Sequence, residues 1–354
     1  MSIGNYLEGT DFGKIDNLLK SGGRKLLVYH SDVDGMCSSA LLMKFFPGFK
    51  SVPREGPVID QGFLEVLVSK KPDVVVFMDI PADQEWRKLM ILKRRLRKTK
   101  IAIIDHHIVE KDMNPLGVLH VNPRFERKEV YIPASAVMYE ILKFLKYPVE
   151  RFLWICAVGV IADYGFEDCK EVLEECERKI PGSLSDKPSP FKLSRIAEML
   201  SSIITLKGLR GAKIGLDLLV KIESFRDVRE HRDLKQYYRK VRREIESIME
   251  DFKKHGEFVP GKNLVIYEIK SRLNITSIIA TKITDTYKNE VIIIRKRSRQ
   301  GWKISLRCQS GEINVGDLAK KASRGIGSGG GHQKSAGALV KDWEKFRSRI
   351  LRQI

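Results

Sequence analysis

The sequence lacks the features that mark secreted and membrane proteins. It has no run of roughly eighteen apolar residues, so no transmembrane helix is expected. Its first residues contain no basic patch followed by an apolar stretch, which argues against a secretory signal. Only 5 of 354 residues are cysteine, and no two of them form a CxxC pair. This usage favours reduced thiols and a cytoplasmic location over a disulfide framework.

Acidic residues are scarce relative to basic ones, and the imbalance is uneven along the chain. The sequence has 64 Lys or Arg and 45 Asp or Glu, a formal net charge of +19. Residues 260–354 contain 20 basic and 7 acidic residues and so carry about two-thirds of the excess. A charge-rich thermophilic surface is the alternative explanation, but it would spread the charge more evenly. The distribution therefore favours contact with a polyanion, and nucleic acid in the first place.

Short apolar segments alternate with helical ones in the first 165 residues. The predicted strands are Lys25–His30, Val74–Asp79 and Lys100–Asp105. The predicted helices between and after them are Gly35–Phe46, Phe63–Ser69 and Glu85–Lys98. Strands that are almost wholly apolar are typical of a sheet buried on both faces. This order predicts an α/β domain with a mainly parallel sheet at residues 1–190.

The rest of the chain predicts a helical connector and a smaller mixed α/β domain. Residues 191–258 form the expected connector, in which Asp227–His255 predicts one long amphipathic helix. Its apolar stripe suits packing against a neighbouring domain or against a second copy of the chain, so a homo-oligomer stays open. In the expected last domain, residues 259–354, strands are predicted at Leu264–Ile269, Val291–Arg295, Trp302–Arg307 and Gly337–Val340, helices at Thr276–Tyr287 and Val315–Ala322, and a glycine-rich loop at Gly325–Gly331.

Acidic residues and histidines gather where the predicted N-terminal strands end. They are His30, Asp32 and Asp34 at the first strand, Asp79 at the second, Asp105, His106 and His107 at the third, and Asp163 after an apolar helix. In an open α/β sheet the carboxyl ends of the strands meet at one crevice, so these side chains should converge. Carboxylates and imidazoles together favour Mn²⁺ and its neighbours over Mg²⁺. A single aspartate there would suit a helix cap or a turn, but four such elements in this order favour a two-metal site.

The order of these motifs resembles the DHH phosphoesterase family with its DHHA1 C-terminal domain. The motifs are HSDVDG, MD, DHH and GVIADYG, followed at a distance by GSGGGHQKSAGA. The resemblance covers nearly the whole chain and is strongest to compact archaeal RecJ-like single-strand exonucleases. It departs from other branches at His30, where bacterial RecJ carries an aspartate. The oligonucleotide-degrading branch has its histidine where this chain has Val28.

The resemblance also implies a role for each residue of the N-terminal motifs. His30, Asp32 and Asp79 would hold one ion, and Asp34, Asp79, His106 and Asp163 would hold the other. His107 would contact the phosphate or donate a proton to the leaving oxygen. Asp105 would orient the imidazoles, although it also suits helix capping.

Further residues near the C-terminus are expected to bind substrate. Consecutive glycines let backbone N–H groups approach an anion, which predicts a phosphate-binding loop. The expected substrate-binding residues are Arg307, Gly329, Gly330, Gly331, His332 and Lys334. The role of Arg307 is implied by the resemblance. The basic hairpin Arg295–Lys303 suits either a solvated tip or a single-strand track that includes Trp302.

The expected function is that of a phosphodiesterase that uses two Mn²⁺ ions, which Mg²⁺ or Co²⁺ could replace. The expected substrate is single-stranded DNA, with RNA left open, degraded from one end during DNA repair or replication. The resemblance favours 3′-to-5′ degradation and a repair helicase or replisome component as protein partner. One alternative is an enzyme for short oligonucleotides or cyclic-dinucleotide products. The other is an inactive Cdc45-like replisome scaffold, which the intact acidic residues oppose.

Overall fold

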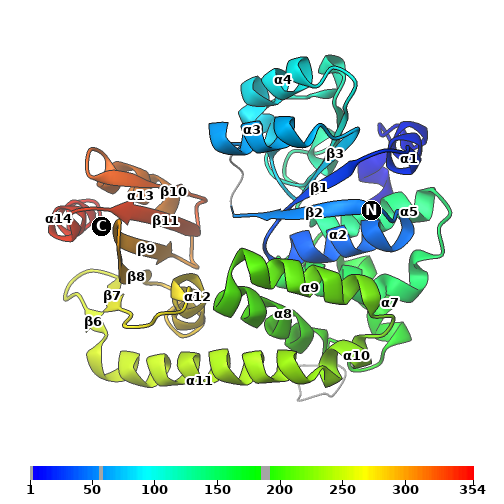
Figure 1. Ribbon diagram of the computed structural model, residues 1–354. Helices are drawn as coiled ribbons and strands as arrows, with labels where there is room; N and C mark the ends of the chain where they lie inside the picture. The colour runs from blue at the N-terminus through cyan, green and yellow to red at the C-terminus, as the bar shows by residue number, and fades with distance from the viewer. Residues whose placement is uncertain (1–2, 56–58, 185–191) are drawn as a thin grey trace. The chain divides into compact units, whose positions relative to one another are not determined.

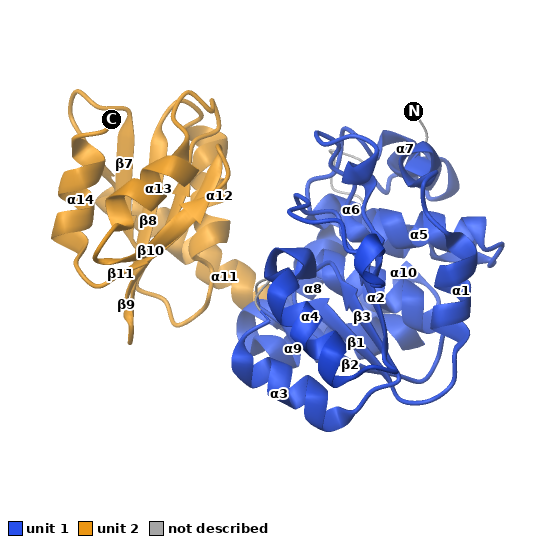
Figure 2. Cartoon of the chain, turned by 90° about the horizontal axis from the view of Figure 1, so that it is seen from above, with its two compact units in different colours: residues 1–238 blue, residues 239–354 orange. Residues whose placement is uncertain are grey.

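The computed structural model describes residues 3–55, 59–184 and 192–354. The chain divides into two compact units, Met1–Tyr238 and Arg239–Ile354 (Figure 2). The division falls within the long helix α11, Arg232–His255 (Figure 1). Among the described residues, no helix combines the length and apolar character that crossing a bilayer requires.

Unit 1 contains a five-stranded parallel sheet, as the sequence predicts. Its strands are β1 Lys25–His30, β2 Phe49–Arg54, β3 Val74–Met78, β4 Lys100–Ile104 and β5 Leu119–Val121. Their order is β2-β1-β3-β4-β5, and every neighbouring pair is parallel. The edge strands β2 and β5 were not expected, because β2 is partly polar and contains Pro53 and β5 is only 3 residues long. Proline and short length are both tolerated at a sheet edge, where half of the backbone groups lack a ladder partner.

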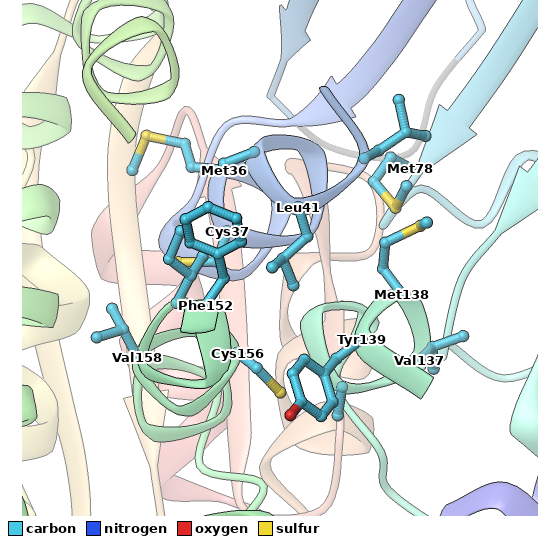
Figure 3. Packing of buried hydrophobic residues seen from close by; sticks show 14 of the residues in the cluster. Met36, Cys37, Leu41, Met78, Val137, Met138, Tyr139, Phe152, Cys156 and Val158 are labelled. Atoms are coloured by element: carbon cyan, nitrogen blue, oxygen red, sulfur yellow. The ribbon is translucent and has the colours of Figure 1, made fainter. Parts of the chain in front are cut away.

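Helices cover both faces of this sheet. The helices of unit 1 are, in chain order, α1 Phe12–Lys20, α2 Val33–Phe45, α3 Gln61–Lys70, α4 Trp86–Arg95, α5 Ala134–Phe144, α6 Leu153–Ala162, α7 Lys170–Lys179, α8 Leu193–Lys207, α9 Leu209–Lys221 and α10 Phe225–Glu230. Helix α2 is buried almost throughout and packs against α5, α6 and α9. Figure 3 shows part of this core, including Met36 of α2, Tyr139 of α5 and Cys156 of α6. A separate apolar cluster joins α3 and α4 to the sheet.

The long helix predicted in the connector is interrupted. The expected helix Asp227–His255 is wrong as one element, because His231 has φ −61° and ψ 117° and separates α10 from α11. Similarly, α8 and α9 are separated at Gly208, whose φ of 57° suits glycine. Phe191, with which the expected connector begins, lies outside the described residues.

Unit 2 contains a mixed six-stranded sheet in the order β10-β11-β9-β8-β7-β6. The strands are β6 Glu257–Phe258, β7 Leu264–Glu268, β8 Val291–Ser298, β9 Gly301–Arg307, β10 Gly327–Gly331 and β11 Ser335–Val340, and the helices besides α11 are α12 Thr276–Thr286, α13 Val315–Ser323 and α14 Trp343–Leu351. Only the pair β7 and β8 is parallel.

The expected glycine-rich loop is wrong for most of its length, because Gly327–Gly331 forms the edge strand β10. It pairs with β11 in antiparallel register. A Cβ atom added to Gly329 would lie 2.7 Å from the backbone oxygen of Ala319 on α13. The missing side chains therefore allow the strand to lie close to the helix, which the composition alone does not distinguish from a loop.

Candidate metal centre

The strand order of unit 1 changes direction between β1 and β3. From β1 the chain continues to β2 on one side, and β3 lies on the other side. Such a switch in direction opens a crevice at the carboxyl ends of parallel strands, where ligands commonly bind. His30 ends β1, and Asp79 follows β3, in which Met78 pairs with Tyr29. Asp105 follows β4 in the same way.

The start of α2 adds two carboxylates to this crevice. Asp32 caps the helix and accepts a hydrogen bond from the Gly35 N–H at 2.9 Å. A Cβ atom on Gly35 would lie 2.1 Å from the His30 carbonyl oxygen, so this turn requires glycine. Asp34 is buried and accepts hydrogen bonds from the N–H groups of Ala134 and Ser135, at 2.7 and 3.1 Å. The N-terminus of α5 thus holds Asp34 in place.

Asp79 lies at the middle of the cluster. Its side-chain oxygens lie 3.5 Å from His30 Nδ1 and 3.3 Å from His106 Nε2. The residue is 2% exposed, and neither carboxylate oxygen has a hydrogen-bond partner among the described residues. Its φ of 57° lies in the left-handed region, which aspartate tolerates better than most residues. A buried carboxylate without donors requires a compensating positive charge.

Three sets of side chains bring potential ligand atoms within 4.8 Å of one another. They are His30, Asp32 and Asp79; Asp34, His106 and Asp163; and Asp79, His106 and His107. The structure therefore brings together all six residues that the sequence predicted as metal ligands. It also brings His107 near enough to act as a ligand, whereas the resemblance assigned this residue to the phosphate or the leaving oxygen.

The predicted substrate-binding residues lie together in unit 2. Arg307 ends β9 and pairs with Ser335, at the start of β11. Its guanidinium donates to Ser277 Oγ at 2.6 Å and to Ser305 Oγ at 3.2 Å. His332 and Lys334 are exposed in the tight turn between β10 and β11. The three glycines are those of β10, and only Gly330 has open space where a Cβ atom would lie.

Each of the two units contains a segment that matches the model of a known protein family. Residues 25–163 match the N-terminal domain of the DHH family, and residues 261–352 match the DHHA1 domain. The chain belongs to the DHH family and has a DHHA1 domain. None of the curated proteins compared with it matches.

Solved structures of the DHH family share the fold at low sequence identity. RecJ from Thermus thermophilus in complex with Mn²⁺ matches 98% of this chain, with 17% identity and a TM-score of 0.74. This chain covers only 55% of that RecJ chain. CDC45 from Entamoeba histolytica matches 97% of this chain and 98% of its own, with 12% identity and a TM-score of 0.64. The pGpG-specific phosphodiesterase PggH from Vibrio cholerae matches 93% and 98%, with 14% identity and a TM-score of 0.53.

The electrostatics of the DHH domain suit a cation. Burial, together with the charges of Asp79 and Asp163, raises the pKa of Asp34 well above its usual range. Burial, together with Asp32 and Asp79, raises the pKa of Asp163 to about 6, although His106 opposes this shift. Burial disfavours the charged form of His106, but the nearby Asp79 carboxylate outweighs this effect and raises the pKa of His106 to about 10. The carboxylates repel one another and attract positive charge, which a bound cation would supply.

Several residues around the DHH motif were missed by sequence reasoning. Tyr131 donates a hydrogen bond from its hydroxyl to Asp163 Oδ2 at 2.8 Å. Asn122 donates to the backbone oxygen of His107 at 3.0 Å, and Arg124 Nε to that of His106 at 2.8 Å. Asn122 and Arg124 follow the short strand β5, and they were missed because that strand was not predicted from the sequence. Tyr131 has no comparable signal in the sequence.

Proposed function

We propose that this protein is a Mn²⁺-dependent phosphodiesterase that degrades single-stranded nucleic acid from one end. The observation that carries the proposal is Asp79, a buried carboxylate with no hydrogen-bond donor among the described residues that belongs to two of the three ligand sets. A carboxylate in that position suits the bridge between two divalent ions. The residues fit such a pair, because every set combines at least one imidazole with carboxylates.

In this proposal the chain's own residues hold two ions. His30, Asp32 and Asp79 would hold one, and Asp34, Asp79, His106 and Asp163 the other. When bound, the ions supply the positive charge that stabilises a phosphoryl group as negative charge develops on it. Tyr131 orients Asp163 through the hydroxyl hydrogen bond described above, and α5 orients Asp34.

His107 is the proposed proton donor or phosphate contact. Its Nδ1 lies 2.8 Å from Asp105 Oδ1, and its backbone N–H donates to Asp105 Oδ2 at 3.2 Å. Asp105 is fully buried, so this pair fixes the imidazole ring. The remaining ring nitrogen, Nε2, is then the atom that can bind a phosphate oxygen or give a proton to the leaving oxygen.

The DHHA1 domain is proposed to hold the nucleic acid through Arg307 and the β10–β11 turn. The net charge of residues 260–354 supports contact with several phosphates. An intact set of acidic residues opposes the alternative of an inactive scaffold. A replisome or repair partner is compatible with the fold shared with CDC45.

The test is degradation of an end-labelled single strand of about twenty nucleotides with Mn²⁺, with Mg²⁺ and with a chelator. Metal-dependent shortening from one end is expected, and the labelled end shows the direction. A metal-free chain that degrades the strand equally well would contradict the proposal. Absence of hydrolysis with every metal would favour the scaffold.

A second candidate is a phosphodiesterase for dinucleotides, which the fold shared with PggH supports. The two candidates differ in what the basic hairpin should do. Replacing Arg297 and Arg299 by Ala should flatten the salt dependence of binding to a long strand and spare dinucleotide hydrolysis, if long strands are the substrate. If dinucleotides are the substrate, the parent protein should bind long strands with little salt dependence.

A further inference from the structure

Three exposed aromatic side chains adjoin the candidate metal centre. They are Tyr131, Tyr164 and Phe166, which are 37%, 68% and 46% exposed. We call them the aromatic ledge. Tyr164 directly follows Asp163, and its ring contacts that of Phe166 edge to face, with the centroids 6.2 Å apart. Tyr131 contacts both the Asp163 carboxylate and the His106 ring, whose centroid is 5.1 Å from its own.

Short-range contacts hold the ledge against the candidate metal centre. The Tyr131 N–H donates to Asp168 Oδ2 at 2.8 Å, which ties the two segments of the ledge together. A Cβ atom on Gly165 would lie 2.5 Å from the Pro133 ring, so this glycine lets the segments pack closely. The Tyr164 backbone has φ 59° because the residue follows the C-terminus of α6 in a helix C-cap, in which the N–H groups of Tyr164 and Gly165 donate to the carbonyl oxygens of Ile161 and Val160. This cap fixes the position of Tyr164 directly after Asp163.

The charge around Tyr164 and Phe166 favours the base of a nucleotide over its phosphate. Residues 163–168 contain three carboxylates and no basic residue, whereas Arg124 interacts electrostatically with Tyr131 and Asp168. The carboxylates beside Tyr164 and Phe166 disfavour phosphate at those two rings, and aromatic rings bind the uncharged face of a base by stacking. We propose that the aromatic ledge stacks the nucleobase next to the phosphate that is cut. This inference rests on the proposed function, and it assigns the ledge to the base and the metal centre to the phosphate.

Binding of a fluorescent base tests the inference without hydrolysis. In chelator, the full chain is titrated with single strands that carry 2-aminopurine at the 3′ end, at the 5′ end or in the centre. Stacking should quench the fluorescence strongly at one end only. Tyr164→Ala together with Phe166→Ala should abolish that quenching and weaken binding about 5- to 150-fold, while Tyr164→Phe should preserve both.

Two further variants separate stacking from folding. Tyr164→Asn removes the ring but suits the left-handed backbone, so thermal stability should be equal or higher while quenching is lost. Phe144→Ala is the matched control, because Phe144 is also exposed but lies at the far end of α5, about 15 Å of helix from Ala134. Its quenching should equal that of the wild type.

Degradation assays distinguish failure of this inference from failure of the proposed function. The wild type should cut a strand whose terminal nucleotide lacks its base about 5- to 150-fold less efficiently than the intact strand. The ledge variant should cut the intact strand and the strand without the terminal base equally. If wild type degrades strands but ignores the terminal base, the ledge does not stack it. Equal quenching at all positions would contradict stacking of the terminal base. If ledge variants bind strands normally but lose self-association, the ledge binds a protein surface and not a base. If no strand is degraded at all, the proposed function fails instead.

Discussion

Replacing Asp79 by Asn should remove most of the stabilisation that metal gives to the DHH domain. Asn keeps the shape of the side chain and tolerates the left-handed backbone at this position. It has one neutral oxygen where Asp79 offers two charged ones to two ligand sets. The substitution thus changes the metal site while leaving the surrounding packing almost intact.

The size of the effect follows from binding linkage. At a Mn²⁺ concentration of 100 times the Kd, a ligand that binds only the folded state adds about 2.7 kcal/mol to the free energy of unfolding. For a unit of this size that is a rise of about 5 to 10 °C in Tm. If the variant binds about 100-fold more weakly, the same concentration adds only about 0.4 kcal/mol, or about 1 °C.

The assay is thermal unfolding in chelator and with Mn²⁺, compared with hydrolysis. Asp83→Asn is the matched control, because Asp83 is also buried but binds the N–H groups of Glu110 and Lys111 and belongs to none of the ligand sets. It should lower the baseline Tm but keep the full rise with metal. Asp79→Asn should also reduce hydrolysis by about 100-fold or more. If metal raises the Tm of Asp79→Asn as much as it raises the Tm of the wild type, the bridging role of Asp79 is refuted.

Three other outcomes are expected from the structure. His30→Asp should keep part of the metal affinity in calorimetric titration, since a carboxylate serves these ions, and unchanged affinity and occupancy would show that His30 is not a ligand. Gly329→Ala should destabilise unit 2 by about 1–3 kcal/mol in denaturant unfolding because its Cβ atom meets Ala319, whereas Gly330→Ala should leave stability unchanged; equal effects would contradict the packing described for β10. Arg307→Ala should lower the salt dependence of single-strand binding by roughly 0.7 in log–log slope, and an unchanged slope would mean that Arg307 contacts no phosphate.

The sequence predicts the parts of the fold that periodicity and apolar runs can report. The central strands β1, β3 and β4 were recognised because they are buried on both faces. The edge strands β2 and β5 were missed because an edge needs neither a long apolar run nor freedom from proline. The strand β10 was missed because a run of glycines is typical of a loop. Only the helix against which these glycines pack explains them.

The candidate site is predictable to the extent that strand ends converge. His30, Asp79 and Asp105 could be assigned to one crevice because parallel strands share an edge. Tyr131 could not, since it precedes α5 in an irregular segment and reaches Asp163 only through the folded chain. Residues that orient other residues depend on tertiary distances, and one sequence contains no record of those distances.

Backbone strain at the metal centre is informative because it can be compared with strain elsewhere in the chain. Among the described residues, the non-glycine positions with positive φ are Lys71, Lys146, Asp79 and Tyr164. Lys71 caps the C-terminus of α3, and Lys146 lies just after α5, where left-handed residues are common. Tyr164 follows the C-terminus of α6 in the same way as Lys146 follows α5. Asp79, by contrast, follows strand β3 and belongs to the carboxylate cluster, so no helix cap explains its backbone. Strain and mutual repulsion each cost folding free energy, and cation binding can offset that cost because it stabilises only the folded state.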